Sequence, residues 1–552
     1  MKKVFQNIIP AAAAVLLTMG FSSCVNDLDV TPIDPNLTLT PDRDAMFNEC
    51  YANFGLEGNK GDGNANITAD DAGTAGLVRQ LFNTNELSTD EAICGWGDGG
   101  IKELVINAYG SGDTMERIYW DRLYKGISDC NQYLSVFGAA DATMTAEVRF
   151  LRAFQYYLLM DAFGNVPFSE GITHTEAAPQ YTRAQMFAWI ENELKENVIP
   201  NLGAAVPVVN SATAGYGRVN KAAAWLLLAR LYLNAEVYTG IPRWNDAKDY
   251  ADLVIASPYD LYQTPTIDPS DNGMRWSAYQ KLFMGDNGES GAAIEAIFPI
   301  LQQGDKTAGY GCSEFLIAST FNTSMHPDRY DPSATNGTTE AWGGNRARKA
   351  LVRVFFDQSK TDEEIALLTK DLTSYEMAAL AGDQRALVWA KDHSLVASNR
   401  TDFGSGYGVC KFTNFRTSGT QTNAKFCDTD YFIMRYAEAL LTSAEAEARI
   451  KGGLSATDAG TTYLNNLRLR AGAATKSSYT VRDILDEWQK EFYFEGHRRV
   501  DLIRYKMFGG STGYQWEWKN GAEEGANFPE YRNIFAIPNT EAPNFYKQNP
   551  NY

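Results

Sequence analysis

Histidines and carboxylates are the side chains of this sequence that could carry acid–base or metal chemistry. The four histidines lie far apart, at His174, His326, His393 and His497. None belongs to an H-E-x-x-H motif, so the sequence does not support metallohydrolase chemistry. The 68 aspartates and glutamates always offer some pair that a glycoside hydrolase could use, so their abundance is not a signal. Residues 509–513 fit G-x-S-x-G without the strand and helix of a nucleophile elbow, which predicts a Gly/Ser turn.

Two short acidic segments could instead supply ligands to a metal ion. One contains Asp286 and Glu289, and the other contains Asp428 and Asp430. Carboxylate oxygens are the hard ligands that calcium prefers. The alternative is a solvated acidic loop without a metal.

A third group of ionisable residues lies within residues 491–501. It comprises Glu491, Glu495, His497, Arg498, Arg499 and Asp501. The group resembles an acid–base site, but neighbouring cations hold carboxylates in the ionised form, which makes them poor proton donors. We therefore predict a salt-bridged structural cluster at the end of a helix.

Apolar residues at helical spacing indicate the elements that position these side chains. Residues 220–238 predict a buried helix, whose apolar face comprises Ala224, Leu227, Leu228, Leu231 and Ala235. The same pattern predicts helices at residues 147–160, 436–450 and 484–494. Strand signals are sparse, and residues 292–300 give the best one. We expect these helices to pack in pairs, but the sequence shows no strict repeat of about 34 residues.

Long segments rich in Gly, Asn, Asp, Thr and aromatic residues separate the predicted helices. They cover residues 55–76, 94–112, 268–291, 305–344 and 402–430. Loops of this length in a compact domain are often functional, because a rigid scaffold can hold them as a binding surface.

The amino-terminal segment has the features of a lipoprotein export signal. Basic residues are followed by an apolar run at residues 8–19 and by small residues directly before Cys24. The run is shorter than the roughly 20 residues needed to span a bilayer. We predict a signal peptide at residues 1–23, a lipidated tether at residues 24–40 and one domain at residues 41–552. The alternative is an ordinary signal peptide with a chance cysteine.

The net charge and the remaining cysteines limit the partners and the covalent structure. A net charge of −19 repels phosphate backbones and anionic lipids, which argues against nucleic acid and favours a neutral ligand. The cysteines other than Cys24 are Cys50, Cys94, Cys130, Cys312, Cys410 and Cys427. They allow many disulfide pairings, buried thiols are an equal alternative, and the spacing of a zinc site is missing.

Several sequence blocks, in order along nearly the whole chain, resemble the SusD-like (RagB/SusD) glycan-binding lipoproteins of Bacteroidetes. They are EVRFLRA at 147–153, FGNVP at 163–167, RVNKAA at 218–223, LARLYL at 228–233, RYAEA at 435–439, NLRLRAG at 466–472, EFYFEGHRRVDL at 491–502 and QNPNY at 548–552. The resemblance implies a mainly α fold, in which four tetratricopeptide-like helix pairs support a loop-rich irregular region. It also implies a SusC-like TonB-dependent outer-membrane transporter as partner, a location on the outer membrane facing the cell exterior, and no enzymatic activity.

Within this family, the chain is similar to the starch-binding member. The similarity includes residues 24–35, 82–91, 225–240 and 516–519. It implies that Trp96, Tyr310 and Trp342 form an aromatic arc that holds starch or maltooligosaccharide, with Asp71 and Arg79 as polar contacts. At Gly97-Asp98-Gly99 the sequence departs from that member, which has an asparagine in contact with sugar. The resemblance also implies a structural calcium at Asp286, Glu289, Asp428 and Asp430; no cofactor is otherwise required.

The chemistry of the proposed site residues agrees with this role. The C–H face of a pyranose ring packs on an aromatic ring, while carboxylates and guanidinium groups bond to its hydroxyls. A single Trp or Tyr in a loop is more often packed beneath it, so these assignments depend on the resemblance. The alternatives are a SusD-like protein for a different glycan, an exported glycoside hydrolase and a structural subunit of the transporter that binds no sugar.

Overall fold

The computed structural model describes residues 40–172 and 177–552. The chain divides into two units, Met1–Met46 and Phe47–Tyr552. The predicted signal peptide, the lipidation site Cys24, residues 24–39 of the predicted tether and His174 lie outside the described residues. No helix within the described ranges is long and apolar enough to cross a membrane.

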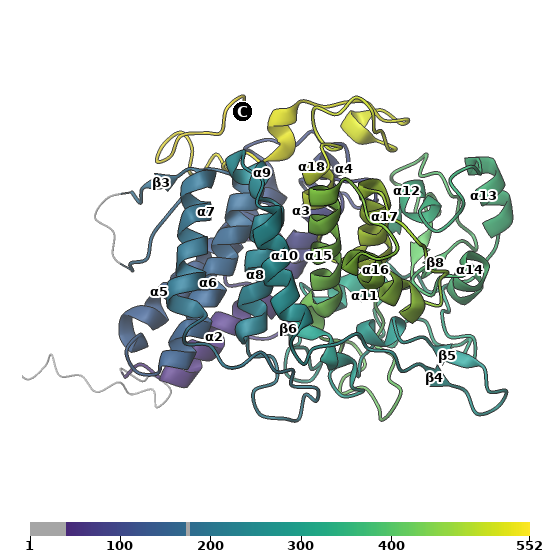
Figure 1. Ribbon diagram of the computed structural model, residues 1–552, viewed down its shortest axis with the longest axis horizontal. Helices are drawn as coiled ribbons and strands as arrows, with labels where there is room; N and C mark the ends of the chain where they lie inside the picture. Colours follow the sequence, from purple (N-terminus) through teal and green to yellow (C-terminus); the bar gives the residue numbers. More distant parts are fainter. Residues whose placement is uncertain (1–39, 173–176) are drawn as a thin grey trace, which may run out of the picture. The chain divides into compact units, whose positions relative to one another are not determined.

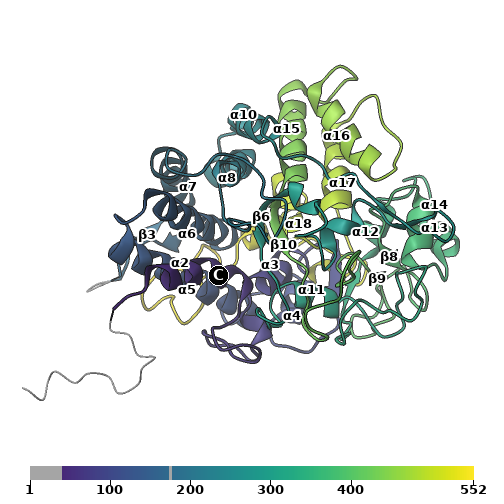
Figure 2. The same ribbon diagram turned by 90° about the horizontal axis from the view of Figure 1, so that it is seen from below.

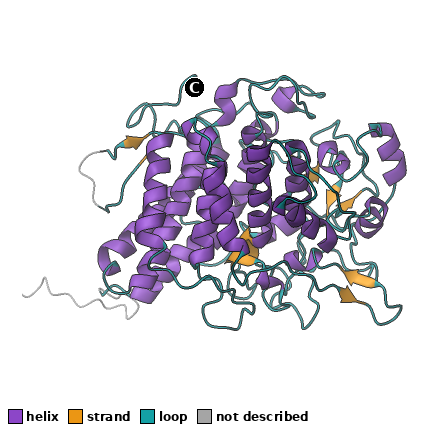
Figure 3. Ribbon diagram, in the orientation of Figure 1, coloured by secondary structure: helices purple, strands orange, loops and turns teal. Residues whose placement is uncertain are grey.

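Helices dominate the described residues, as Figures 1 and 3 show. The longer ones are α2 (Arg43–Gly55), α3 (Leu77–Asn85), α5 (Thr114–Phe137), α6 (Ala142–Phe163), α7 (Arg183–Asn192), α8 (Lys221–Leu233), α10 (Trp244–Ile255), α15 (Tyr436–Lys451), α16 (Ala459–Arg470) and α17 (Val481–Phe492). The shorter ones are α4 (Ile101–Val105), α9 (Ala235–Thr239), α11 (Ser313–Ala318), α12 (Lys349–Arg353), α13 (Asp362–Thr369), α14 (Ser374–Ala381) and α18 (Arg498–Arg504). The prediction of a mainly α fold is confirmed.

The helices predicted from periodicity are present, but the one expected at residues 220–238 is interrupted. It forms α8 and α9, which Asn234 separates. The side chain of Asn234 donates to the carbonyl of Arg230 and accepts a hydrogen bond from Arg504, 3.0 Å away. Hydrogen bonds of an asparagine side chain with the backbone and with a distant side chain compete with the hydrogen bonds that would continue the helix. The predicted apolar face of this segment is fully buried.

The longer helices pack side by side, some with their neighbours in the chain and some with more distant helices. Helix α5 packs on α6, α10 packs on both α8 and α15, and α15 also contacts α16 and α17. Figure 2 shows α7, α8, α10, α15 and α16 following one another along the upper edge of the view, with α11 and β9 below them. Fully buried alanines such as Ala439 and Ala444 let neighbours approach α15 closely. The grouping into four tetratricopeptide-like pairs stays a prediction.

The strands of the described residues form antiparallel pairs. They are β1 (Ala92–Cys94) with β7 (Asn345–Ala347), β2 (Val166–Pro167) with β3 (Gln180–Tyr181), β4 (Thr266–Ile267) with β5 (Met274–Trp276), β6 (Ala296–Ile300) with β10 (Tyr431–Arg435), and β8 (Val388–Trp389) with β9 (Gly408–Val409). The strand predicted at residues 292–300 is confirmed for Ala296–Ile300, which is buried at every position. Its first residues form the short 3₁₀ helix η4 (Ala292–Ile294) instead.

Buried ion pairs join the end of β10 to the end of α17. Arg435 donates to Glu491 at 2.7 Å and to Glu495 at 2.8 Å, and all three side chains are almost inaccessible to solvent. Arg470 also bonds to Glu491, and Lys411 bonds to Glu495 at 2.7 Å. Arg470, Arg435 and Arg385 hold the pKa of Glu491 well below its usual range despite its burial.

The charged residues after α17 pair with other parts of the fold. Arg498 bonds to Asp90 at 2.7 Å, Arg499 bonds to Asp161 at 2.9 Å, and Asp501 bonds to Arg504 at 2.7 Å. Together with the pairs of Glu491 and Glu495, they confirm the predicted salt-bridged structural cluster.

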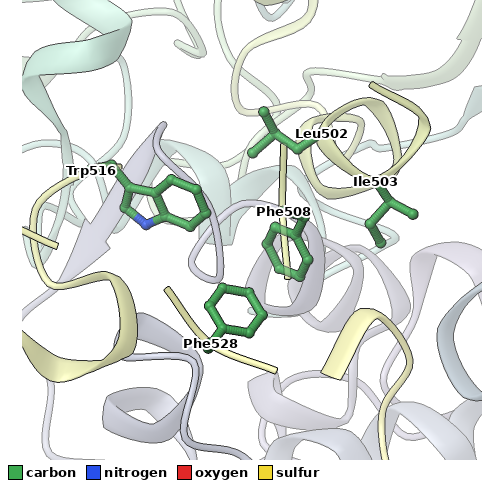
Figure 4. Close-up of a cluster of buried hydrophobic side chains, with 5 residues drawn as sticks. All are labelled: Leu502, Ile503, Phe508, Trp516 and Phe528. Atoms are coloured by element: carbon green, nitrogen blue, oxygen red, sulfur yellow. The ribbon is translucent and has the colours of Figure 1, made fainter. Parts of the chain in front are cut away.

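The carboxy-terminal segment is fixed by an apolar cluster beside α18. Figure 4 shows Leu502 and Ile503 of this helix facing Phe508, Trp516 and Phe528 from the loops that follow. The rings of Phe508 and Phe528 meet edge to face at 5.0 Å. Trp516 is therefore a core residue.

We expect the substitution Arg435→Met to lower the free energy of unfolding by about 3–5 kcal/mol, because it leaves buried carboxylates without a partner. Urea denaturation measures this change. The matched control Lys506→Met removes a bond to Glu236 from a side chain that is 79% exposed. It should change stability by less than about 1 kcal/mol. Equal effects of the two substitutions would contradict the structural role of Arg435.

Candidate functional site

The structure brings together three aromatic side chains from separate loops. The ring centroid of Trp342 lies 6.4 Å from that of Trp96 and 5.9 Å from that of Tyr310. The planes of these neighbouring rings are inclined by 54° and 51°. All three residues are half-buried, so each ring is held by the protein and also reaches its surface. Trp342 is therefore the middle ring of a row, as the predicted arc requires.

The β1–β7 pair positions the two tryptophans. Trp96 follows β1 and Trp342 precedes β7. In this antiparallel pair Ala92 lies opposite Ala347, and Cys94 lies opposite Asn345. Gly344 has a φ of +105°, and a Cβ atom there would lie 2.1 Å from Nε1 of Trp96. Only glycine fits this position, because a side chain would be strained and would collide with the indole. Arg400 fixes the Trp96 loop by donating to two of its carbonyls.

Backbone contacts position the third ring. The amide of Tyr310 donates to Oε2 of Glu57 at 2.9 Å. The next residue, Gly311, packs against Gly76, where a Cβ atom would lie 2.4 Å from the Cα of Gly311. The carbonyl of Gly311 also accepts a hydrogen bond from the amide of Arg79 at 3.0 Å. The loop of Tyr310 is thus attached directly to the start of α3.

The two predicted polar residues lie beside the aromatic row. Arg79 Nη1 lies 3.4 Å from Asp71 Oδ1, and its guanidinium lies 5.4 Å from the ring centroid of Trp96. Burial lowers the pKa of Arg79, whose side chain is 6% exposed, whereas the side chain of Asp71 is half exposed. Asp71 therefore offers an accessible acceptor that Arg79 holds in place.

The site also contains residues that the sequence analysis did not assign. Glu340 Oε2 accepts from Nε1 of Trp342 at 2.6 Å and so orients the indole. Lys425 Nζ lies 4.9 Å from the ring centroid of Tyr310. Phe403 is 39% exposed and lies against Gly95 and Gly343, next to the tryptophans. The only sequence signal for them is their place in long loops that carry aromatic residues.

This arrangement can bind a ligand that has both apolar faces and hydroxyl edges. Flat rings offer stacking surfaces, Asp71 offers an acceptor, and Lys425 offers a donor. Burial raises the pKa of a deeper carboxyl group, that of Glu314, to about 8, but this side chain is 1% exposed and does not reach the surface. The geometry is that of a binding surface.

The four acids predicted to bind calcium are bonded to protein donors. Arg416 donates to Asp428 at 3.1 Å and also to Glu289. Asp286 accepts two hydrogen bonds from Thr417, and its Oδ1 is buried without a partner.

Asp430 completes this set of acids and is also bonded to protein groups. It accepts from the hydroxyl of Tyr216 at 2.6 Å and from the amide of Gln302 at 2.7 Å. No group of three or more acid, cysteine or histidine side chains in the described ranges could hold a metal ion. As arranged, Glu289 and Asp428 pair with Arg416, whereas Asp286 and Asp430 are bonded to neutral protein donors. A structural calcium at these acids stays a prediction.

Comparisons with known proteins identify the class of protein that this fold represents. Residues 382–552 match the family model described as "SusD family", and residues 60–233 match the model described as "Starch-binding associating with outer membrane". The chain is 34% identical to "Starch-binding protein SusD" of Bacteroides thetaiotaomicron, over 97% of this chain and 96% of that protein. It is 25% identical to "SusD-like protein P2" of Formosa agariphila over 98% of both chains. The protein therefore belongs to the SusD family.

Solved structures agree with this assignment of the fold. Surface glycan-binding protein A from Bacteroides fluxus has a TM-score of 0.62 at 20% identity, and covers 92% of this chain and 99% of its own. The same protein from Bacteroides thetaiotaomicron, solved in complex with laminarihexaose, has a TM-score of 0.61 at 20% identity, over 92% of this chain and 98% of its own.

The stability of the folded protein should fall as the pH rises from about 4 to about 7, because buried Asp430 must lose its proton. We expect the substitution Asp430→Asn to remove this part of the pH dependence. Burial and the neighbouring acids Glu289 and Asp428 raise the pKa of Asp430 to about 7, against about 3.9 in the unfolded chain. The folded state therefore binds the extra proton between these values. Its stabilising contribution is complete below about pH 4 and is lost as the pH rises through about 7.

Calorimetric melting temperatures at pH 5 and pH 8 measure this effect. The melting temperature of the variant minus that of the unsubstituted protein should be about 2–5 °C larger at pH 8 than at pH 5. Asp249→Asn, at an exposed position of α10, is the control and should show no such gain. A pH-independent difference between Asp430→Asn and the unsubstituted protein would contradict the raised pKa.

Proposed function

We propose that this protein captures a glycan at the cell surface for import by a SusC-like TonB-dependent transporter, and that the glycan is starch or a maltooligosaccharide. The observation that carries the proposal is the row of half-buried rings formed by Trp96, Trp342 and Tyr310. A pyranose that stacks on such a ring buries apolar surface, at about 25 cal/mol per Å². Three platforms in one row bind successive sugars of a chain.

The inclination of the rings supports a curved ligand. Neighbouring ring planes are inclined by 54° and 51°, so sugars stacked on all three platforms cannot lie in one flat ribbon. An α-1,4-linked glucan coils in this way, whereas a β-1,4-linked glucan is extended. The relative with 34% identity, which is described as starch-binding, supports the same ligand.

A different glycan is the second candidate, and a specific observation favours it. One structural neighbour was solved with laminarihexaose, and another is described as a laminarin-binding SusD-like protein. Both are at most 20% identical to this chain, so they support the fold more strongly than the ligand.

Binding without catalysis agrees better with the carboxylates of this surface than a glycoside hydrolase does. A hydrolase needs two carboxylates on opposite sides of the scissile bond, with one protonated. Here Asp71 is held by Arg79, and Glu340 accepts from the Trp342 indole. Asp71 is thus held as an acceptor for ligand hydroxyl groups, and Glu340 positions the Trp342 indole.

The proposed location is the outer membrane, through a lipid on Cys24. Tethering makes the transfer of a captured glycan to the transporter effectively intramolecular. Modest affinity at each site is then sufficient, which agrees with a surface that uses stacking and few charged contacts.

We expect the substitution Trp342→Ala to weaken the binding of maltoheptaose by at least about tenfold, because it removes the platform between the other two rings. Isothermal titration calorimetry measures the dissociation constant. The control Tyr375→Ala removes a ring that is 37% exposed on α14, and it should leave binding unchanged. An unchanged dissociation constant in Trp342→Ala, with the fold intact by circular dichroism, would rule out the aromatic row as the site.

A panel of glycans tests the ligand class. The unsubstituted protein should bind maltoheptaose and amylopectin more tightly than laminarihexaose, cellohexaose, xylan or fructan in the same calorimetric assay. Tighter binding of laminarihexaose would contradict starch as the ligand and support the second candidate, a different glycan. The release of reducing sugar from the bound glycan on prolonged incubation would show that the protein is an enzyme.

A further inference from the structure

Residues 47–53 of α2 contact α5, and the two segments run in opposite directions. The rings of Phe47 and Tyr133 meet at 5.9 Å near one end of the contact. Towards the other end, a Cβ atom on Gly126 would lie 2.1 Å from Nδ2 of Asn53. Residues three and four apart lie on the same face of a helix. The residues between these two contacts on the facing surfaces are therefore Cys50 on α2 and Cys130 on α5.

The two thiols meet in the interior of the protein. Cys50 and Cys130 are both at 0% exposure. A hydrogen bond between Cys50 and Cys130, together with burial, raises the pKa of Cys50. Gln155 fixes the other side of the pair, because its Nε2 lies 3.8 Å from Sγ of Cys130 and its Oε1 accepts from Asn53.

We propose that Cys50 and Cys130 are oxidised to a disulfide that joins α2 to α5 in the exported protein. A thiolate of one cysteine attacks the disulfide of a thiol–disulfide oxidant, and the second thiolate displaces that oxidant. One S–S bond forms in the protein, one breaks in the oxidant, and the oxidant leaves as two thiols that take up both protons. Because both sulfur atoms are inaccessible in the folded state, the exchange takes place while the chain folds.

The cross-link would hold the elements that support the aromatic row. Arg122 of α5 donates to the side chain of Asn53 at 3.0 Å and to the carbonyl of Glu57 at 2.7 Å. Glu57 in turn accepts from the amide of Tyr310. A covalent bond between α2 and α5 therefore fixes the helix from which the Tyr310 loop is held. The proposed disulfide rests on the proposed function, since an exported location supplies the oxidising environment.

Peptide mapping tests the pairing independently of location. The full chain is denatured with reductant, refolded in a buffer of reduced and oxidised glutathione, blocked with N-ethylmaleimide and digested without reduction. Mass spectrometry should detect a peptide in which Cys50 is linked to Cys130 as the main form of both residues. Cys94 and Cys410, which lie on β1 and directly after β9, should carry maleimide. Maleimide on both Cys50 and Cys130, or linkage of either to another cysteine, would overturn the proposal.

Thermal melting provides the second readout. A disulfide that closes a long loop restricts the unfolded chain. The refolded protein should therefore melt about 5 °C higher than the same sample treated with a phosphine reductant. The double variant Cys50→Ser/Cys130→Ser should lose this difference, and Cys94→Ala/Cys410→Ala should retain it. An equal melting temperature of the unsubstituted protein with and without the reductant would contradict the cross-link.

Glycan binding by the refolded sample separates this proposal from the proposed function. A linked Cys50–Cys130 peptide in a protein that binds no glycan refutes the function alone. Maltoheptaose binding by a protein with both cysteines blocked refutes the disulfide alone.

Discussion

The buried pairing of Arg435 with Glu491 and Glu495 is the constraint on which the rest of the structure depends. Arg435 ends β10 and directly precedes α15, while the two glutamates lie at the end of α17 and just beyond it. Ions removed from water are costly unless each charge is paired and hydrogen-bonded. These side chains satisfy one another only when strand and helix meet in one geometry, so the network selects a single arrangement of the helical scaffold and the loops attached to it.

The candidate site uses that scaffold without being part of it. Its rings come from loops, and these loops are fixed by main-chain contacts such as the amide of Tyr310 on Glu57 and the β1–β7 pairing beside Trp96 and Trp342. Glycine at position 344 lets one loop touch the indole of Trp96. A binding surface built in this way can vary in its rings and polar groups while the helices beneath it stay unchanged.

Much of the fold could be predicted from the sequence, because helical periodicity is a local signal. The break at Asn234 could not, since Arg504 recruits that side chain from a distant part of the chain. The residues predicted for the site lie together, but periodicity alone does not bring Trp96 near Tyr310; the family resemblance did. Glu340 and Lys425 were missed because their positions depend on the paths of long loops.

A crystal structure of the full chain with maltoheptaose tests the central claim most directly. We expect electron density for successive glucose rings stacked on Trp96, Trp342 and Tyr310, with hydroxyl groups within hydrogen-bonding distance of Asp71. Sugar bound at another surface, with these rings left free, would contradict it.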